Sequence, residues 1–298
     1  MNKHLKLIER NSKLFFKDKG MFFCSLITPL ILLFLYITFL GKSFEDSYSQ
    51  VIPQGAIVSE KVINGLTGGQ LLSSLLSTSG VTVAFCSNLL MVQDKISGAR
   101  KDLLMTNLNK STLSISYYIS TLFVTILVSI VATIIAMIYL AFVGWYLSFL
   151  DCILILFDIV LVAMFGTALS SIINYFLTTQ GQVSAVGMII SSMYGFICGA
   201  YMPISSFGSV IQKVLLFLPS TYISSLLRNH CMRGAFAEFE KSGVPKVIVD
   251  EIKKGIDFDL RFFETSVSTG VMLAVIIGTI SILLITYVFM NKFSKKKS

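Results

Sequence analysis

The residues Asp94 to Lys110 read DKISGARKDLLMTNLNK, and this short charged stretch lies between two long uncharged segments. No charged residue occurs from Ile63 to Gln93 before it, or from Ser111 to Leu150 after it. An apolar run of about 20 residues is long enough to cross a lipid bilayer as a helix. The pattern predicts two membrane-spanning helices joined by a charged loop.

The whole chain has the composition of a membrane protein. Of its 298 residues 54% are hydrophobic and 13% are charged, whereas soluble domains carry about a quarter charged residues. We expect an all-α polytopic membrane protein with six transmembrane helices. The spans are expected at about 20–41, 70–92, 115–140, 152–176, 183–202 and 267–290. The first is too long for the apolar core of a signal peptide and lacks a good cleavage site, so we expect it to be retained.

Lysines and arginines are distributed unequally among the predicted loops. The first 19 residues, the 94–110 stretch and the C-terminal tail hold 14 of the 24 basic residues but only 4 of the 16 acidic ones. Cytoplasmic loops of membrane proteins are enriched in lysine and arginine. We therefore expect this loop and both termini in the cytoplasm. The net charge of +8 then reflects topology, and no nucleic-acid partner is expected.

Residues 1–19 are predicted to form a cytoplasmic interfacial helix. Five of the six basic residues fall within one arc of about 80° at 100° per residue: Lys3, Lys6, Arg10, Lys13 and Lys17. Four apolar residues fall on the opposite side: Leu5, Ile8, Phe15 and Phe16. Such a helix lies among lipid headgroups, with its basic residues toward anionic lipid and its phenylalanines toward the acyl chains. The alternative is a basic tail without this orientation.

Residues 203–266 form the largest predicted non-membrane segment. Up to residue 234 it is apolar, with breaks at Pro203 and Pro219, and each half of about 14 residues is too short to cross. We expect a re-entrant outer pair of helices. Pro245 to Lys254 predicts a short helix with proline at its first position, and the following IDFDLRF alternates as a strand does. The pair is thus followed by a small external cap.

No pattern for a catalytic, cofactor or metal site stands out. Histidines and cysteines show no metal-ligand or disulfide spacing. Gly41-Lys42-Ser43 lacks the earlier glycine of a phosphate-binding loop, because Tyr36 stands there. An energised function would therefore use ATP hydrolysed on a separate chain.

Asp158 is the one ionisable residue inside a predicted span, and such an acid is a functional-site hypothesis. It lies about 10 Å beyond Asp151 along the fourth span. The alternative is an acid that faces a wet cavity or bonds a neighbouring hydroxyl. Without a basic or histidine partner in the other spans, a proton relay is disfavoured.

The 94–110 stretch is either a solvated connector that only fixes topology or a docking element. Ser97-Gly98-Ala99 precedes an amphipathic turn from Arg100 to Met105, whose apolar residues are available for a partner's groove. The residues alone leave both interpretations open.

Three stretches and the order of the spans resemble a known family. The first comprises Arg10-Asn11, Phe15 to Asp18 and TPLILLFLY at 28–36. The second comprises Asp94, Gly98, Lys101, Leu103-Leu104 and residues 107–110. The third comprises Pro203, LPSTY at 218–222, Arg228 and Gly234. They resemble the N-terminal helix and first span, the loop after the second span, and the outer re-entrant pair of the type-2 ABC exporter permeases. Asn107 departs from that family, which often has proline there.

The resemblance implies that separate chains hydrolyse ATP and form the transport pathway. An ATPase subunit, which holds ATP and Mg²⁺, would dock on the N-terminal helix and the 94–110 loop. Six residues are the expected coupling residues: Asp94, Gly98, Arg100, Lys101, Leu103 and Leu104. Four others form the expected outer gate: Pro203, Pro219, Tyr222 and Arg228. A second copy, or a related permease, would complete the pathway.

The expected function is the permease half of an ATP-driven exporter in a bacterial plasma membrane, with residues 20–298 as its six-span domain. Its substrate would be drug-like, a lipid or a peptide, and the second and fifth spans would line the route. One alternative is a proton-coupled secondary transporter that uses Asp158, although no internal repeat supports it. A membrane enzyme is disfavoured because no acid or histidine cluster lies near an interface. A non-transporting immunity or sensor protein also fits the external cap.

Overall fold

The computed structural model describes residues 3–52, 58–106, 108–263 and 265–293. The elements, in chain order, are α1 (Lys3–Lys17), α2 (Lys19–Leu35), the π-helical η1 (Tyr36–Leu40), α3 (Gly41–Val51), α4 (Glu60–Ile96), α5 (Ala99–Met105), α6 (Lys110–Val143), α7 (Phe149–Phe176), α8 (Gln180–Ile197), the 3₁₀ turn η2 (Ile204–Ser206), α9 (Ser209–Leu215), α10 (Pro219–Lys241), α11 (Lys246–Gly255), β1 (Arg261–Phe262), β2 (Thr265–Ser266) and α12 (Thr269–Phe293). Asn107 and the basic tail 294–298 lie outside the described residues.

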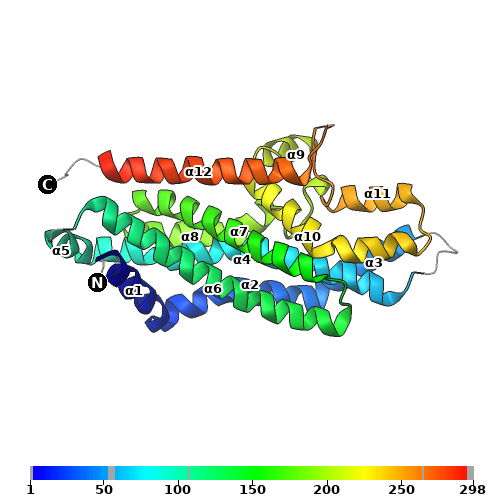
Figure 1. The fold of residues 1–298 in the computed structure, drawn as a ribbon, viewed down its shortest axis with the longest axis horizontal. Helices are drawn as coiled ribbons and strands as arrows, with labels where there is room; N and C mark the ends of the chain where they lie inside the picture. The colour runs from blue at the N-terminus through cyan, green and yellow to red at the C-terminus, as the bar shows by residue number, and fades with distance from the viewer. Residues whose placement is uncertain (1–2, 53–57, 107, 264, 294–298) are drawn as a thin grey trace.

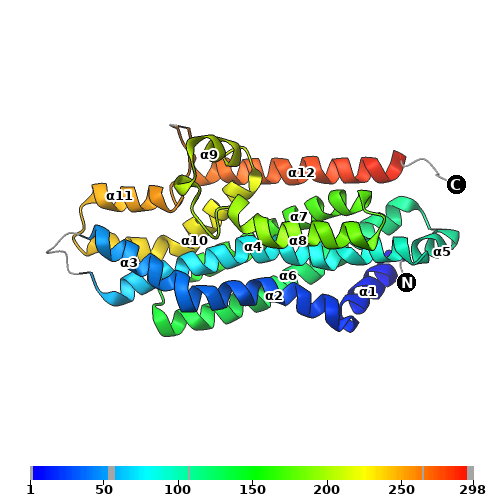
Figure 2. The same ribbon diagram turned by 180° about the vertical axis from the view of Figure 1, so that it is seen from behind.

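The long helices run side by side in one bundle (Figures 1 and 2). The start of α1, the end of α12 and α5 lie at one end of the bundle, and α3 and α11 lie at the other. Whether the two termini share one side of the membrane stays a prediction. Which side faces the cytoplasm stays a prediction.

The centre of the bundle is α4. Every residue from Gly65 to Phe85 is buried, and α4 packs against α6, α7, α10, α2 and α8. Small residues allow this close approach. A Cβ atom on Gly80 would lie 2.3 Å from Val162 of α7, and one on Gly69 would lie 2.7 Å from the carbonyl oxygen of Cys231 on α10. The polar composition of the predicted second span is therefore explained by helix packing.

Five described helices are long and apolar enough to cross a membrane: Lys19–Gln50, α4, α6, α7 and α12. They cover five of the six predicted spans. The predicted fifth span, 183–202, overlaps α8, which has 18 residues and is not among the five. The predicted end was five residues too late, because Gly199 is left-handed (φ +74°). Its N–H and that of Ala200 bond back to Phe196 and Gly195 and close the helix.

The predicted boundaries elsewhere need correction. The polar stretch after the first span is not a loop at its start, because η1 and α3 continue the helix to Val51. The second re-entrant half is not about 14 residues long: α10 has 23 and bends 85° from α9, and the polar residues of its first half, such as Ser224, Ser225 and Arg228, are buried. Pro245 precedes α11 as its N-cap rather than occupying its first position. The strand-like segment reduces to a two-residue pairing of β1 with β2.

Candidate functional site

Three helices meet at Asp94, near the end of α4 that lies beside the termini. Arg10 of α1 donates two hydrogen bonds to its carboxylate, with Nη1–Oδ2 and Nη2–Oδ1 distances of 2.6 and 3.1 Å. The hydroxyl of Tyr117 on α6 donates a third. Paired bonds between a guanidinium and a carboxylate are strong and directional. The hydrogen bonds with Asp94 raise the pKa of Arg10, so the arginine stays charged. We call these three residues the Asp94 clamp.

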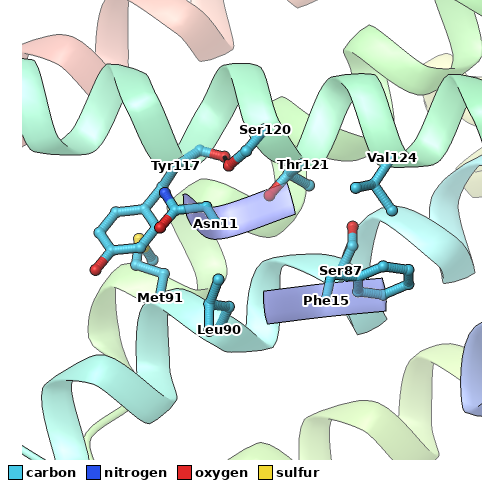
Figure 3. A pocket seen from close by; sticks show the side chains of 9 residues that line it. All are labelled: Asn11, Phe15, Ser87, Leu90, Met91, Tyr117, Ser120, Thr121 and Val124. Carbon is cyan, nitrogen blue, oxygen red and sulfur yellow. Dashed lines mark hydrogen bonds between the residues drawn. The ribbon is translucent and has the colours of Figure 1, made fainter. Parts of the chain in front are cut away.

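An apolar seam extends the clamp along α1. Leu7, Asn11 and Phe15 recur every four residues, so they share one face of the helix, and all three are buried. Figure 3 shows Asn11 and Phe15 near side chains of α4 and α6. The cavity among these residues has a volume of about 10 Å³, too small for a transported substrate. This region is a helix-packing seam.

The helix α1 covers most of the predicted interfacial segment, and its position at a membrane interface stays a prediction, but two of its residues face protein instead of lipid. Arg10 was expected to face anionic headgroups and instead binds Asp94, because α4 brings a buried carboxylate within its reach. Phe15 was expected among acyl chains and is buried in the seam. Leu5, by contrast, is 60% exposed, and Phe16 and Lys17 are also exposed. Ile8 is half-buried.

The helix α5 projects from the same end and presents two unlike faces. It begins after Gly98, whose φ of +85° suits glycine. Leu103 and Leu104 pack against the apolar cluster around Phe15 and are partly buried. Lys101, Asp102 and Met105 face outward, and Met105 is 82% exposed. Arg100 lies between the two faces, half-buried. The predicted coupling residues therefore divide between the clamp, the turn and the two faces of α5.

Lys95 ties this end of α4 to α7. Its ammonium group donates hydrogen bonds to the backbone carbonyls of Tyr175 and Leu177, at 2.5 and 2.9 Å. A cation at a helix C-terminus satisfies carbonyls that have no partner within the helix. Lys95 thus fixes the end of α4 to the end of α7.

Asp158 does have a histidine partner, contrary to the sequence-based expectation. Its Oδ2 lies 2.6 Å from Nδ1 of His230 on α10, and both side chains are largely buried. On the same two helices, Asp151 forms an ion pair with Arg233 at 2.6 Å. The expectation failed because α10 is a long helix packed along α7, so it carries His230 to Asp158. We call these two pairs the α7–α10 clasp.

Arg228, one of the predicted outer-gate residues, is buried and binds groups from other elements. Its Nη2 donates to the carbonyl of Gly199 after α8, and its Nη1 lies 3.6 Å from Oδ2 of Asp257. Asp257 also accepts hydrogen bonds from the backbone amides of Ile204 and Ser205. Burial raises the pKa of Asp257, and Arg228 and these two amides oppose that rise.

The remaining gate residues lie on the elements that Arg228 joins. Pro203 precedes η2, Pro219 opens α10, and Tyr222 is buried on α10. Arg228 thus connects α8, η2, α10 and the cap.

Besides the pairs of the α7–α10 clasp, four residues that were not among the predicted site residues contribute to these arrangements. Tyr117 and Asn11 complete the Asp94 clamp and its seam, Asp257 binds Arg228, and Met105 is the most exposed apolar residue of α5. Only Met105 had a local signal, since 100° per residue places it on the face of Lys101 and opposite Leu103. Within the described ranges, no group of three or more histidine, cysteine or acidic side chains could hold a metal ion.

Comparison with known proteins gives one match. The family model described as "ABC-2 type transporter" matches residues 5–230. The matched segment begins in α1 and ends in α10 at His230, and it includes the Asp94 clamp and α5. No curated protein matches the chain.

Proposed function

The chain belongs to the ABC-2 type transporter family, whose members are membrane subunits of ABC transporters, and from this premise we propose that it is the permease of an ATP-driven exporter. ATP and Mg²⁺ would be held by a separate ATPase subunit. The exporter would move a drug-like, lipid or peptide substrate out across a bacterial plasma membrane. A second copy, or a related permease, would complete the pathway.

The observation that carries this proposal is the Asp94 clamp beside α5. The clamp fixes α1 to α4 and α6 through charge-assisted hydrogen bonds, and α5 continues directly from α4. A push on α1 or α5 would therefore act on the central helix rather than on a loose loop. Because α4 is buried against most of the bundle, a shift of α4 changes several helix interfaces at once.

The outward face of α5 is the proposed contact for the ATPase. Met105 supplies exposed apolar area, flanked by Lys101 and Asp102. Burying an apolar side chain at an interface contributes about 1.5–3 kcal/mol. Leu103 and Leu104 instead hold α5 against the bundle, so they would transmit motion inward.

The test is co-purification after gentle solubilisation from the native membrane. Wild-type protein is expected to carry a stoichiometric soluble ATPase, and Met105→Asp is expected to lose it. The matched control is Val247→Asp on α11, an exposed apolar residue at the opposite end, which should retain the ATPase. Retention by Met105→Asp would reject this docking face, and recovery of active wild-type protein without an ATPase would reject the exporter proposal.

A further inference from the structure

A large pocket lies away from the Asp94 clamp, between α9, α11 and the β1–β2 hairpin. Its volume is about 720 Å³, within the range of ligand-binding clefts. Three basic side chains line it, one from each element: Lys213 of α9, Lys254 of α11 and Arg261 of β1. Lys254 and Arg261 lie beyond the segment that the family model matches.

The charge in this pocket is unbalanced. Lys213, Lys254 and Arg261 are exposed, and none makes an ion pair with another residue of the described chain. Two acids also line the pocket, but Asp257 is buried and already engaged by Arg228 and backbone amides. Only Asp259 remains to offset three cations. The pocket therefore favours an anion such as a phosphate group.

The pocket adjoins an exposed apolar surface. Along α9 and its end, Val210, Ile211, Val214 and Phe217 share one face and are 53–75% exposed. Lys213 lies at the border of this face, between it and the pocket. The ring of Phe217 packs against Phe262 and Phe263 of the hairpin, at centroid distances of 5.2 and 6.2 Å. Apolar residues beside lysine are typical of segments that lie at a membrane surface.

The position of the pocket along the bundle supports a lipid. The strand β2 ends at Ser266, and α12, one of the helices able to cross a membrane, begins at Thr269. The hairpin therefore lies where the last span leaves the bilayer, at the end of α12 away from the C-terminus (Figure 1).

We propose that this pocket binds the headgroup of an anionic phospholipid in the outer leaflet. Lys213, Lys254 and Arg261 would hold its phosphate, and its acyl chains would lie along the exposed face of α9 and Phe217. A free phosphate would satisfy the cations but would leave this apolar face uncovered. The site lies away from α5, beside the end of α12 that is farther from α5 (Figure 1), so its loss would leave the proposed ATPase contact untouched.

The experiment measures lipid binding to delipidated, detergent-solubilised full-length protein by native mass spectrometry. Phosphatidylglycerol is expected to bind more tightly than phosphatidylcholine. Each lysine or arginine beside an anionic lipid surface is expected to lower the dissociation constant of the lipid roughly fivefold. The variant Lys213→Gln/Lys254→Gln/Arg261→Gln should therefore bind phosphatidylglycerol roughly a hundredfold more weakly. Phe217→Ser should also weaken phosphatidylglycerol binding, because it removes apolar surface from the proposed acyl-chain contact.

The matched control is Lys246→Gln, an exposed lysine of α11 outside the pocket, which should bind as the wild type does. Because the three basic residues are exposed, the triple variant should keep the wild-type melting temperature in the absence of lipid. The three single variants measure the contribution of each residue to lipid binding separately. Equal binding of the two lipids, or unchanged binding by the triple variant, would overturn the proposal. Displacement of the lipid by equimolar inorganic phosphate would identify a free-anion site and overturn it as well.

Discussion

At the scale of single residues, the two sides of the Asp94 clamp are unequal. The side chain of Asp94 is 8% exposed and that of Arg10 is 31% exposed. Removing the arginine leaves a buried carboxylate with one donor, whereas removing the carboxylate lets the guanidinium turn toward solvent. We expect Arg10→Ala to lower the free energy of unfolding by about 1–3 kcal/mol, and Asp94→Asn to lower it less. Thermal unfolding in detergent measures both.

The control is Lys13→Ala, which removes only an exposed ion pair with Glu9 and should leave the free energy of unfolding unchanged. A loss of stability in Lys13→Ala equal to that in Arg10→Ala would contradict the proposed role of the Asp94 clamp.

The same residues show what the sequence could and could not predict. Arg10 and Asp94 were both expected to lie in the ATPase-contacting region, but not to bind each other. They are 84 residues apart, and Asp158 and His230 are 72 apart, whereas helical periodicity relates only residues three or four positions apart. Contacts between residues far apart in the sequence depend on which helices pack together, and the local sequence pattern of one helix does not reveal its neighbours.

At the scale of elements, the α7–α10 clasp tests the proton-coupled alternative. Asparagine at position 158 can still bond His230, so Asp158→Asn should keep the clasp with a loss of about 1 kcal/mol or less. In an ATP-driven exporter this variant should leave ATP hydrolysis by the co-purified complex intact. Proteoliposomes that contain the permease without its ATPase should show the same proton flux for wild type and variant. A wild-type flux that Asp158→Asn abolishes would instead favour a proton-coupled transporter.

Element centres were predictable and element ends were not. Uncharged runs mark the part of a helix that lies in lipid, so the predicted spans fall on α2, α4, α6, α7 and α12. Polar residues at the ends were interpreted as loops, yet α3 and the first turns of α4 remain helical. In α10, Ser224, Ser225 and Arg228 are buried by protein contacts. Polarity indicates a residue outside lipid, but not a residue outside a helix.

At the scale of the whole molecule, the number of crossings must be even if both termini lie on one side. The start of α1 and the end of α12 lie at one end of the bundle, but within the described residues five separate helices are long and apolar enough to cross. At 1.5 Å per residue the 18 residues of α8 cover about 27 Å, close to the roughly 30 Å of a bilayer core. We therefore expect α8 to be the additional crossing, stabilised by packing against α4 rather than by its own hydropathy.

Single cysteines at the two ends of α8 test this topology. Gln180 and Ser206 are both exposed, one at the start of α8 and the other in η2 just beyond its end. A membrane-impermeant maleimide should label Ser206→Cys in intact cells, and Gln180→Cys only after permeabilisation, relative to the parent protein. Labelling of both in intact cells, or of neither, would mean that α8 does not cross. The bent α9–α10 pair would then have to supply the sixth crossing, which would place buried Arg228 within the membrane and change its energetics.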